Sequence, residues 1–160
     1  MQKADMSNPE SVSQHGCAIV LGARGLIVLG PSGSGKSRLC HLLVERRTEQ
    51  NLYARWVADD RFFFEEAGEQ VPGDKLIVRS PDSIAGLAER RFRGIEPVSY
   101  QTRAVVDLVV QLELTENLER LPDSSLKWTS LGGVELPLIK VPCHPIEQAI
   151  ELVETHLKQN

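Results

Sequence analysis

The sequence predicts an α/β fold, a mixed sheet with flanking helices, and three segments carry this prediction. Residues 25–29 form a short apolar run that leads directly into a glycine-rich loop. Residues 105–114 are mostly apolar and rich in β-branched side chains, as expected of a strand buried on both faces. Residues 145–158 carry apolar side chains at helical spacing, with proline in the first turn. The 160 residues fit one domain with its own core.

The remaining elements follow from apolar spacing and from the turn residues between the runs. We expect the strand at 105–114 to be central. Residues 115–129 are polar and are predicted to form a loop, and Pro137 is expected to break the extended segment around it. In chain order the predicted elements are strands at 15–21 and 26–29, a helix at 36–48, strands at 53–58, 62–64, 75–79 and 105–114, an extended segment at 134–141 and a helix at 145–158.

Composition and charge limit the classes of partner. The net charge is −4, so no broad basic face for nucleic acid is expected. Arg90, Arg91 and Arg93 form the sharpest basic cluster, which fits either a solvated turn or contacts to phosphate or to an acidic partner. A secretory leader and an apolar run of about 20 residues are both missing from the sequence, so we expect a cytoplasmic protein that does not span a membrane.

The cysteines predict neither a disulfide framework nor a zinc site. They are Cys17, Cys40 and Cys143, an odd number at wide spacing without a CxxC pair. Cys17 and Cys40 stand in apolar surroundings and are predicted to be small core residues. Residues 1–13 are polar and are expected to form a flexible terminus, which leaves residues 14–160 as a single domain.

A phosphate-binding loop is predicted at residues 30–37, which match the pattern GxxxxGK[ST]. Its glycines allow positive φ, so that successive N–H groups can point at phosphate oxygens. Lys36 adds a mobile positive charge, and Ser37 offers a hydroxyl to Mg²⁺ where the helix begins. A plain glycine turn is the alternative interpretation. The predicted nucleotide-binding residues are Gly30, Pro31, Ser32, Gly33, Ser34, Gly35, Lys36 and Ser37.

Two adjacent carboxylates, Asp59 and Asp60, follow the predicted strand at 53–58. Strand ends in open α/β sheets commonly present ligand-binding groups, and phosphoryl transfer needs a carboxylate for the metal and often another for the incoming hydroxyl. Side chains of neighbouring residues on a strand point to opposite sides, so one of the two is expected to face the terminal phosphate. An ordinary Asp-Asp turn is the alternative. Glu89 is a weaker candidate on local grounds, because exposed glutamates are common.

Several segments, taken in order, resemble the catalytic domain of the bacterial HPr kinase/phosphorylase family. The phosphate-binding loop alone is unspecific, but the string Val-Ala-Asp-Asp-Arg at residues 57–61 makes the resemblance specific. The resemblance extends over about residues 13–155, and the form of the family that the chain resembles is the short, alphaproteobacterial-type form. Residues 14–160 are therefore predicted to be one kinase-like catalytic domain. The matching segments are Gln14–Gly16, Gly30–Ser37, Trp56–Arg61, Ala85–Ile95, Leu108–Glu113, Glu119–Leu121 and Leu131–Pro142.

The resemblance implies a P-loop fold similar to that of phosphoenolpyruvate carboxykinase. It implies a kinase that uses ATP, often also pyrophosphate, with Mg²⁺ to phosphorylate a serine of the phosphocarrier protein HPr. Many members also run phosphorolysis, and related enzymes are hexamers. By the family pattern, Asp59 is the base for the serine hydroxyl and Arg120 acts on transition-state charge. The implied catalytic residues are Asp59, Lys36, Arg120 and His15, and the implied metal ligands are Ser37, Glu89 and Asp60.

The chain departs from the family pattern at two places. Phe92 stands where the family usually has glycine, and Pro145-Ile146-Glu147-Gln148 replaces a Pro-Gly-Arg-Asn loop. The second change removes a positive charge from an anion site, so we expect phosphorolysis to be weak or absent.

Three functions therefore remain open: an HPr serine kinase, a kinase of another protein or of a small metabolite, and an ATP-binding regulatory module without turnover. The apolar face of the terminal helix either packs on its own sheet or serves a homo-oligomer.

Overall fold

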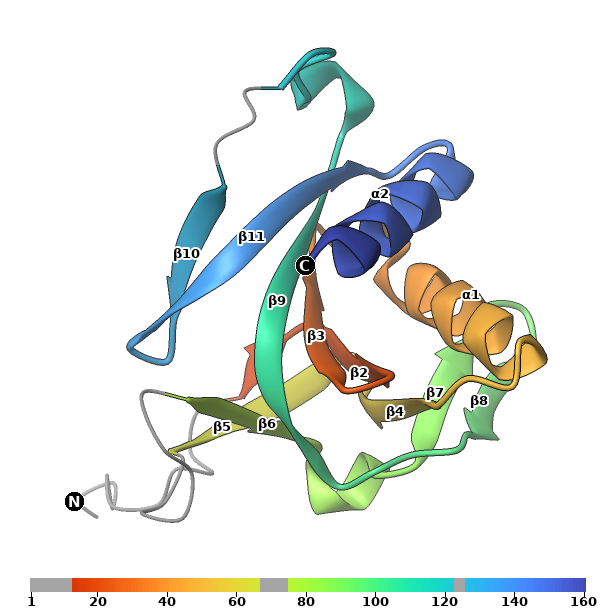
Figure 1. Ribbon diagram of the computed structural model, residues 1–160. Helices are drawn as coiled ribbons and strands as arrows, with labels where there is room; N and C mark the ends of the chain where they lie inside the picture. The colour runs from red at the N-terminus through yellow and green to blue at the C-terminus, as the bar shows by residue number, and fades with distance from the viewer. Residues whose placement is uncertain (1–12, 67–74, 123–125) are drawn as a thin grey trace, which may run out of the picture.

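The computed structural model describes residues 13–66, 75–122 and 126–160, and the expected N-terminal segment lies outside them apart from Ser13. The described residues form a nine-stranded mixed sheet, a separate two-stranded hairpin, two α-helices and two short 3-10 helices at Asp82–Ile84 and Thr115–Asn117 (Figure 1). The strands are β1 (Gln14–His15), β2 (Cys17–Leu21), β3 (Arg24–Leu29), β4 (Ala54–Ala58), β5 (Arg61–Glu66), β6 (Leu76–Arg79), β7 (Leu87–Arg90), β8 (Gly94–Pro97), β9 (Arg103–Glu113), β10 (Lys127–Leu131) and β11 (Val134–Pro142), and the helices are α1 (Lys36–Glu49) and α2 (Ile146–Gln159).

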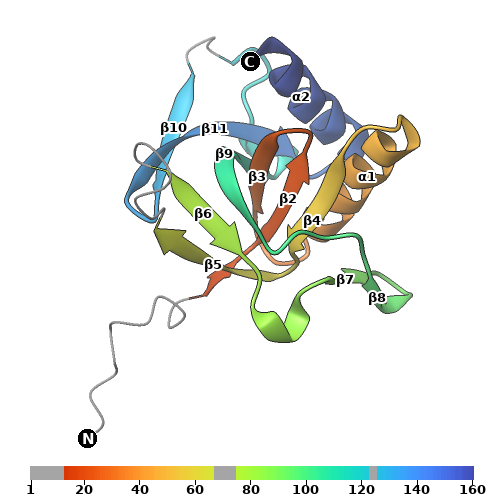
Figure 2. The same cartoon turned by 60° about the horizontal axis from the view of Figure 1, so that its bottom comes forward.

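The strand β9 is central, as predicted. It pairs antiparallel with β6 along its first residues and parallel with β3 and β11 farther along. The main path of the sheet is β1-β5-β6-β9-β3-β2-β4, with β11 and β10 added beside β9. The mixed α/β architecture expected from the sequence is therefore confirmed, and the sheet curls as it passes from β4 round to β10 (Figure 2).

The strands are buried on both faces because the curled sheet separates two cores. In β2, Cys17, Ile19 and Leu21 join the core under the helices, whereas Ala18 and Val20 join a second core on the opposite face. Both helices cover the first face, and the second core lies inside the curl between the strands themselves (Figures 1 and 2). This explains why the strand segments are nearly continuous apolar runs rather than alternating ones.

The two helices are held by apolar residues at the predicted spacing. In α1, Leu39 and Leu43 are fully buried. In α2, Ile146, Ala149, Ile150 and Val153 are buried in the same core, so this face of the helix packs on its own sheet. Within the described ranges, neither helix has the length and apolar character needed to cross a membrane.

Three sequence predictions about the strands are wrong. The first predicted strand divides at Gly16 into β1 and β2. Residues 115–129, predicted to form a loop, contain the start of β10. The residues of β10 pair with the first part of β11, from Val134 to Leu138. Pro137 does not break β11, because pairing with β9 begins only at Leu138 and this ladder does not use the N–H that proline lacks.

The hairpin β7–β8 has no counterpart among the predicted elements. Its strands are four residues each, and in β7 Ala88 alone is fully buried, so the sequence carries little alternation to detect. The hairpin lies beside α1 and β4 at the edge of the molecule (Figures 1 and 2). The Arg90, Arg91 and Arg93 cluster falls in this hairpin and its turn.

Gly25 is required where β3 meets β9. A Cβ atom at this position would stand 1.9 Å from the backbone oxygen of Val105, and the Gly25 N–H donates to Asp107 Oδ2 at 2.9 Å. We expect Gly25→Ala to lower the free energy of unfolding by about 3 kcal/mol or more, up to failure to fold, because backbone must move. Gly22→Ala is the matched control: its φ is +64° and the space is open, so only conformational strain of about 1–2 kcal/mol is expected. Urea unfolding of both variants measures the difference, and equal losses would contradict the close approach.

Candidate active site

The phosphate-binding loop joins β3 to α1, and its glycines are needed for its shape. Gly33 and Gly35 have φ of +75° and +97°, and Gly35 is the N-cap of α1. A Cβ on Gly30 would lie 2.7 Å from Ser34 Oγ and 2.9 Å from the Leu112 Cβ. The loop therefore keeps its backbone, rather than side chains, at the start of α1, where unpaired N–H groups favour an anion.

The polar side chains of the loop suit a phosphate group. Lys36 Nζ donates to the carbonyl oxygens of Gly30 and Pro31, at 2.9 Å each, so its charge is held over the loop. Ser34 Oγ is buried and has no hydrogen-bond partner among the described residues. The Ser34 hydroxyl is in the same loop as the Lys36 ammonium group and the N-terminus of α1. A buried hydroxyl without a partner at such a place suits a ligand with many acceptor oxygens.

Asp59 is the residue that connects this loop to the rest of the site. It follows β4 and its side chain is buried. Oδ1 accepts a hydrogen bond from Ser37 Oγ at 2.6 Å and another from Cys17 Sγ at 3.2 Å, and Oδ2 accepts one from the Glu89 backbone N–H at 2.7 Å. Cys17 is thus a buried core residue, as predicted, but it also holds the carboxylate. The oxygen Oδ2 keeps acceptor capacity for one more donor.

The peptide groups of Glu89 fix β7 against the loop. Its N–H binds Asp59, and its carbonyl oxygen lies 3.1 Å from His41 Nε2, on the first turns of α1. The other ring nitrogen of His41 lies 3.3 Å from Arg90 Nη2, and Arg90 also binds Glu45 and Glu96. These partners suit the His41 tautomer in which Nε2 donates to the Glu89 carbonyl oxygen, because Nδ1 faces a guanidinium donor.

A hollow of about 860 Å³ lies over these groups. Lys36, Ser37, His41, Asp60 and Glu89 are among its lining residues, together with part of the hairpin turn. Asp60 is exposed, with φ of +69°, whereas Asp59 lies beneath. The two aspartates thus face different surroundings, as the sequence predicted for neighbouring carboxylates.

Local charges and burial set the ionisation of two further groups. Burial, and next the neighbouring Cys17 thiol, raise the pKa of Cys40 well above its usual value, so this thiol stays protonated. The hydrogen bond to Glu45 raises the pKa of Arg90. The Arg90 guanidinium therefore stays charged at the base of the hairpin, where Glu45 and Glu96 balance it.

Five candidate residues are not among those that line the hollow. Gly30 and Pro31 belong to the phosphate-binding loop, and Asp59 is bonded to Ser37, which does line it.

Among the described residues, His15 and Arg120 have no such link to the lining. His15 is exposed in β1, paired with Arg61 of β5, and Arg120 is exposed in the segment after β9. His41, which does line the hollow, was missed. It stands four residues after Ser37, on the same face of α1, and this spacing was the available signal.

The metal ligands predicted from the family remain predictions. Ser37, Asp60 and Glu89 all line the hollow. In the part of the chain that the structure describes, no group of three or more His, Cys, Asp or Glu side chains is arranged to hold a metal by itself. Mg²⁺ in phosphoryl-transfer sites commonly takes one or two protein ligands and completes its shell with phosphate oxygens and water, so the residues present fit it.

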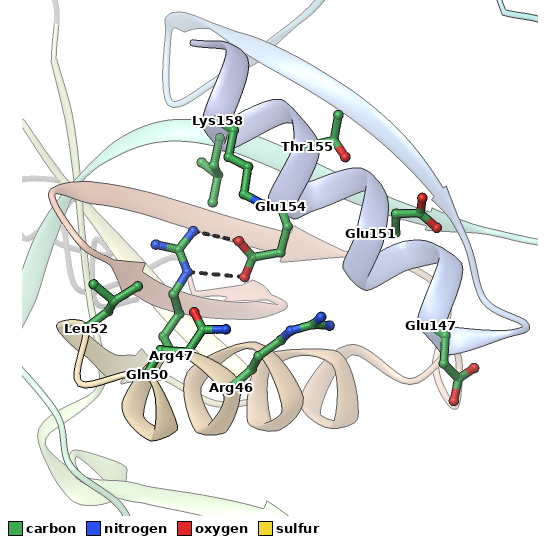
Figure 3. A pocket seen from close by; sticks show the side chains of 10 residues that line it. Arg46, Arg47, Gln50, Leu52, Glu147, Glu151, Glu154, Thr155 and Lys158 are labelled. Carbon is green, nitrogen blue, oxygen red and sulfur yellow. Dashed lines mark hydrogen bonds and ion pairs between the residues drawn. The ribbon is translucent and has the colours of Figure 1, made fainter.

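A second hollow, of about 680 Å³, lies between the end of α1 and α2 (Figure 3). Arg47 binds Glu154 across it through two hydrogen bonds of 3.1 and 2.8 Å. None of the candidate site residues lines this hollow, and it contains no phosphate-binding loop. The Arg47–Glu154 ion pair joins the two helices.

We expect His41→Leu to lower the free energy of unfolding by about 1–3 kcal/mol, because it leaves the Glu89 carbonyl without its side-chain donor and removes the His41 contact of Arg90, which keeps Glu45 and Glu96. His41→Gln, whose amide can donate to the same carbonyl, should recover part of the loss. Urea unfolding measures both. Equal stability of His41→Leu and the unchanged protein would show that the hydrogen bonds of His41 do not contribute to the free energy of unfolding.

Comparison with known proteins identifies relatives of this chain. No protein-family model matches the chain. Curated relatives do: HPr kinase/phosphorylase of Chlorobium phaeobacteroides is 32% identical over 151 residues, covering 88% of this chain and 41% of that protein. The Chloroherpeton thalassium protein of the same name is 34% identical over 140 residues, covering 82% and 38%. The chain thus spans less than half the length of these relatives.

A solved structure shares the fold. The Hpr(Ser) kinase/phosphatase from Coxiella burnetii superposes with a TM-score of 0.76 at 22% identity, covering 93% of this chain and 90% of that one. Its likeness concerns the fold, and the sequence relatives supply the family. Taken with the phosphate-binding loop and the Asp59 carboxylate bonded to it, these matches mean that the chain belongs to the HPr kinase/phosphorylase family.

Proposed function

We propose that this chain transfers the γ-phosphoryl group of ATP to a serine hydroxyl of the phosphocarrier protein HPr, in the presence of Mg²⁺. The observation that carries the proposal is the 2.6 Å hydrogen bond between Ser37 Oγ and Asp59 Oδ1. It brings a carboxylate next to the serine that ends the phosphate-binding loop. A phosphoryl-transfer site needs these two groups together.

The chain's own residues divide into those that bind and those that move a proton. The loop N–H groups, Ser34 and Lys36 would hold the phosphates of ATP, and Ser37 with Glu89 and Asp60 would hold Mg²⁺. When bound, Mg²⁺ neutralises charge on the transferred phosphoryl group. Asp59 Oδ2 accepts the proton of the serine hydroxyl as the hydroxyl oxygen bonds to phosphorus, and ADP leaves.

One observation supports the opposite division of roles between the aspartates. Asp59 is buried and bonded to Ser37, whereas Asp60 is exposed in the hollow and within reach of an incoming protein. In that arrangement Asp59 would serve the metal and Asp60 the hydroxyl. The family pattern favours Asp59 as the base, so this is the assignment that we propose.

Further features belong to the same proposal. His15 and Arg120 would act only if a part of the site outside the hollow's lining, such as a neighbouring subunit, completes it. A homo-oligomer, hexameric by family resemblance, would supply such a neighbour. A cytoplasmic location, no nucleic acid or membrane partner, and weak or absent phosphorolysis complete the proposal.

Purified chain incubated with ATP, Mg²⁺ and HPr should yield phosphoserine on HPr. Lys36→Ala and Asp59→Ala should each lower the rate by at least about 100-fold, because each removes a group that acts on the reacting atoms. Lys158→Ala, an exposed lysine on α2, is the control and should leave the rate unchanged. Full activity of either site variant would contradict the assignment. Labelling of another component of a lysate but not of HPr would favour a different acceptor, and ATP binding without any transfer would favour a regulatory module.

The magnesium dependence of Asp59→Asn and Asp60→Asn distinguishes the two aspartates. Loss of the base should lower kcat at every Mg²⁺ concentration, whereas loss of a metal ligand should raise the concentration needed and be rescued by excess Mg²⁺. We expect the first result for Asp59→Asn and the second for Asp60→Asn. The reverse pattern would exchange their roles.

A further inference from the structure

The turn of the β7–β8 hairpin carries a phenylalanine that the fold itself does not use. The Phe92 side chain is 97% exposed, and its φ is +66°. A bulky residue at positive φ is strained, and an exposed aromatic ring gains nothing from burial. Glycine would relieve the strain and remove the exposed ring. Phe92 is thus unfavourable for the isolated chain on two counts, which indicates a use outside its own core.

Phe92 stands at the rim of the hollow and on a fixed support. It lines the hollow together with Lys36 and Ser37. The base of the hairpin is tied by the bonds of Glu89 to Asp59 and His41, and by the ion pairs of Arg90. The ring therefore projects from a rigid base at a set position relative to Asp59. An exposed aromatic side chain on a backbone held at its base is the kind of group that anchors protein interfaces.

The two arginines on either side of Phe92 differ in their ion pairing. Arg93 pairs with Glu96 at 2.9 Å, whereas the Arg91 guanidinium lies 5.4 Å from the Phe92 ring centre. Among the residues that the structure describes, no carboxylate lies within ion-pair distance of Arg91. Ile95, opposite Glu89 in the hairpin, is 72% exposed. The turn thus presents an apolar projection with a cation that lacks an anionic partner.

This shape selects among possible occupants. A small ligand needs a concave site that covers most of its surface, and a projecting ring provides none. A projection fits a macromolecule that brings its own depression. Among macromolecules, the acceptor is the one whose hydroxyl has to enter the hollow that Phe92 and Arg91 line together with Lys36 and Ser37, so a partner bound at this turn stands beside the proposed phosphate site.

We propose that Phe92, with Arg91 beside it, is a docking anchor for the protein acceptor. The ring enters an apolar depression bordered by carboxylate groups on the acceptor, and this contact brings the acceptor hydroxyl over Asp59. The inference rests on the proposed function and goes beyond it by naming the surface and the chemistry of the partner.

The test compares Phe92→Gly, Phe92→Tyr and a control, Trp128→Ala, which alters an exposed aromatic residue of β10 outside the lining of the hollow. Initial rates are measured against HPr concentration at saturating Mg-ATP. Phe92→Gly should raise the KM for HPr at least about 10-fold, with kcat within twofold and the Kd for Mg-ATP unchanged. The Tm of Phe92→Gly should equal or exceed that of the unaltered chain, because glycine adopts this φ freely. Misfolding would then not explain the higher KM for HPr. Phe92→Tyr and Trp128→Ala should keep the KM.

Two results would overturn the proposal: an unchanged KM for HPr in Phe92→Gly, whether or not sedimentation shows a loss of self-association, or a raised Kd for Mg-ATP. If the unaltered chain transfers no phosphoryl group to HPr, calorimetric titration with HPr separates the two hypotheses. Binding that Phe92→Gly abolishes would support the docking anchor while the proposed function fails. Absence of binding would refute the anchor as well.

Discussion

The Asp59 carboxylate is the point on which both the fold and the site depend. It is buried, and a buried carboxylate is tolerated only when donors satisfy it. Those donors come from three other elements: Cys17 from β2, Ser37 from α1 and the Glu89 backbone from β7. The need to satisfy one charge therefore brings the phosphate-binding loop, the edge of the sheet and the hairpin together, and the hollow lies where they meet.

The fold could be predicted wherever the residues of a segment by themselves indicate that the segment is buried. The strand β9 is buried along most of its length, and α2 has a simple apolar stripe. Predictions failed where pairing with a distant segment decides the structure. The strand β10 exists because it pairs with β11, and Pro137 is tolerated because of the register between β11 and β9. The hairpin β7–β8 has too few buried positions to leave a pattern.

The same distinction between local features and long-range contacts applies to the site. The phosphate-binding loop and the position of Asp59 after β4 are local features, and the sequence predicts both. The contact of Glu89 with Asp59 joins residues 30 positions apart. His41 was missed because a histidine within a helix has no special meaning until the carbonyl that it binds is known. His15 and Arg120 came from resemblance alone, and nothing local tied them to the hollow.

The central claim is that Asp59 and the phosphate-binding loop act on one terminal phosphate. The most direct measurement is a crystal structure of the chain with Mg²⁺ and a non-hydrolysable ATP analogue. We expect Mg²⁺ on Ser37 Oγ at about 2.1 Å, and Asp59 facing the terminal phosphate directly or through one water molecule. A terminal phosphate that lies away from Asp59, out of reach even through a bridging water or ion, would contradict the account.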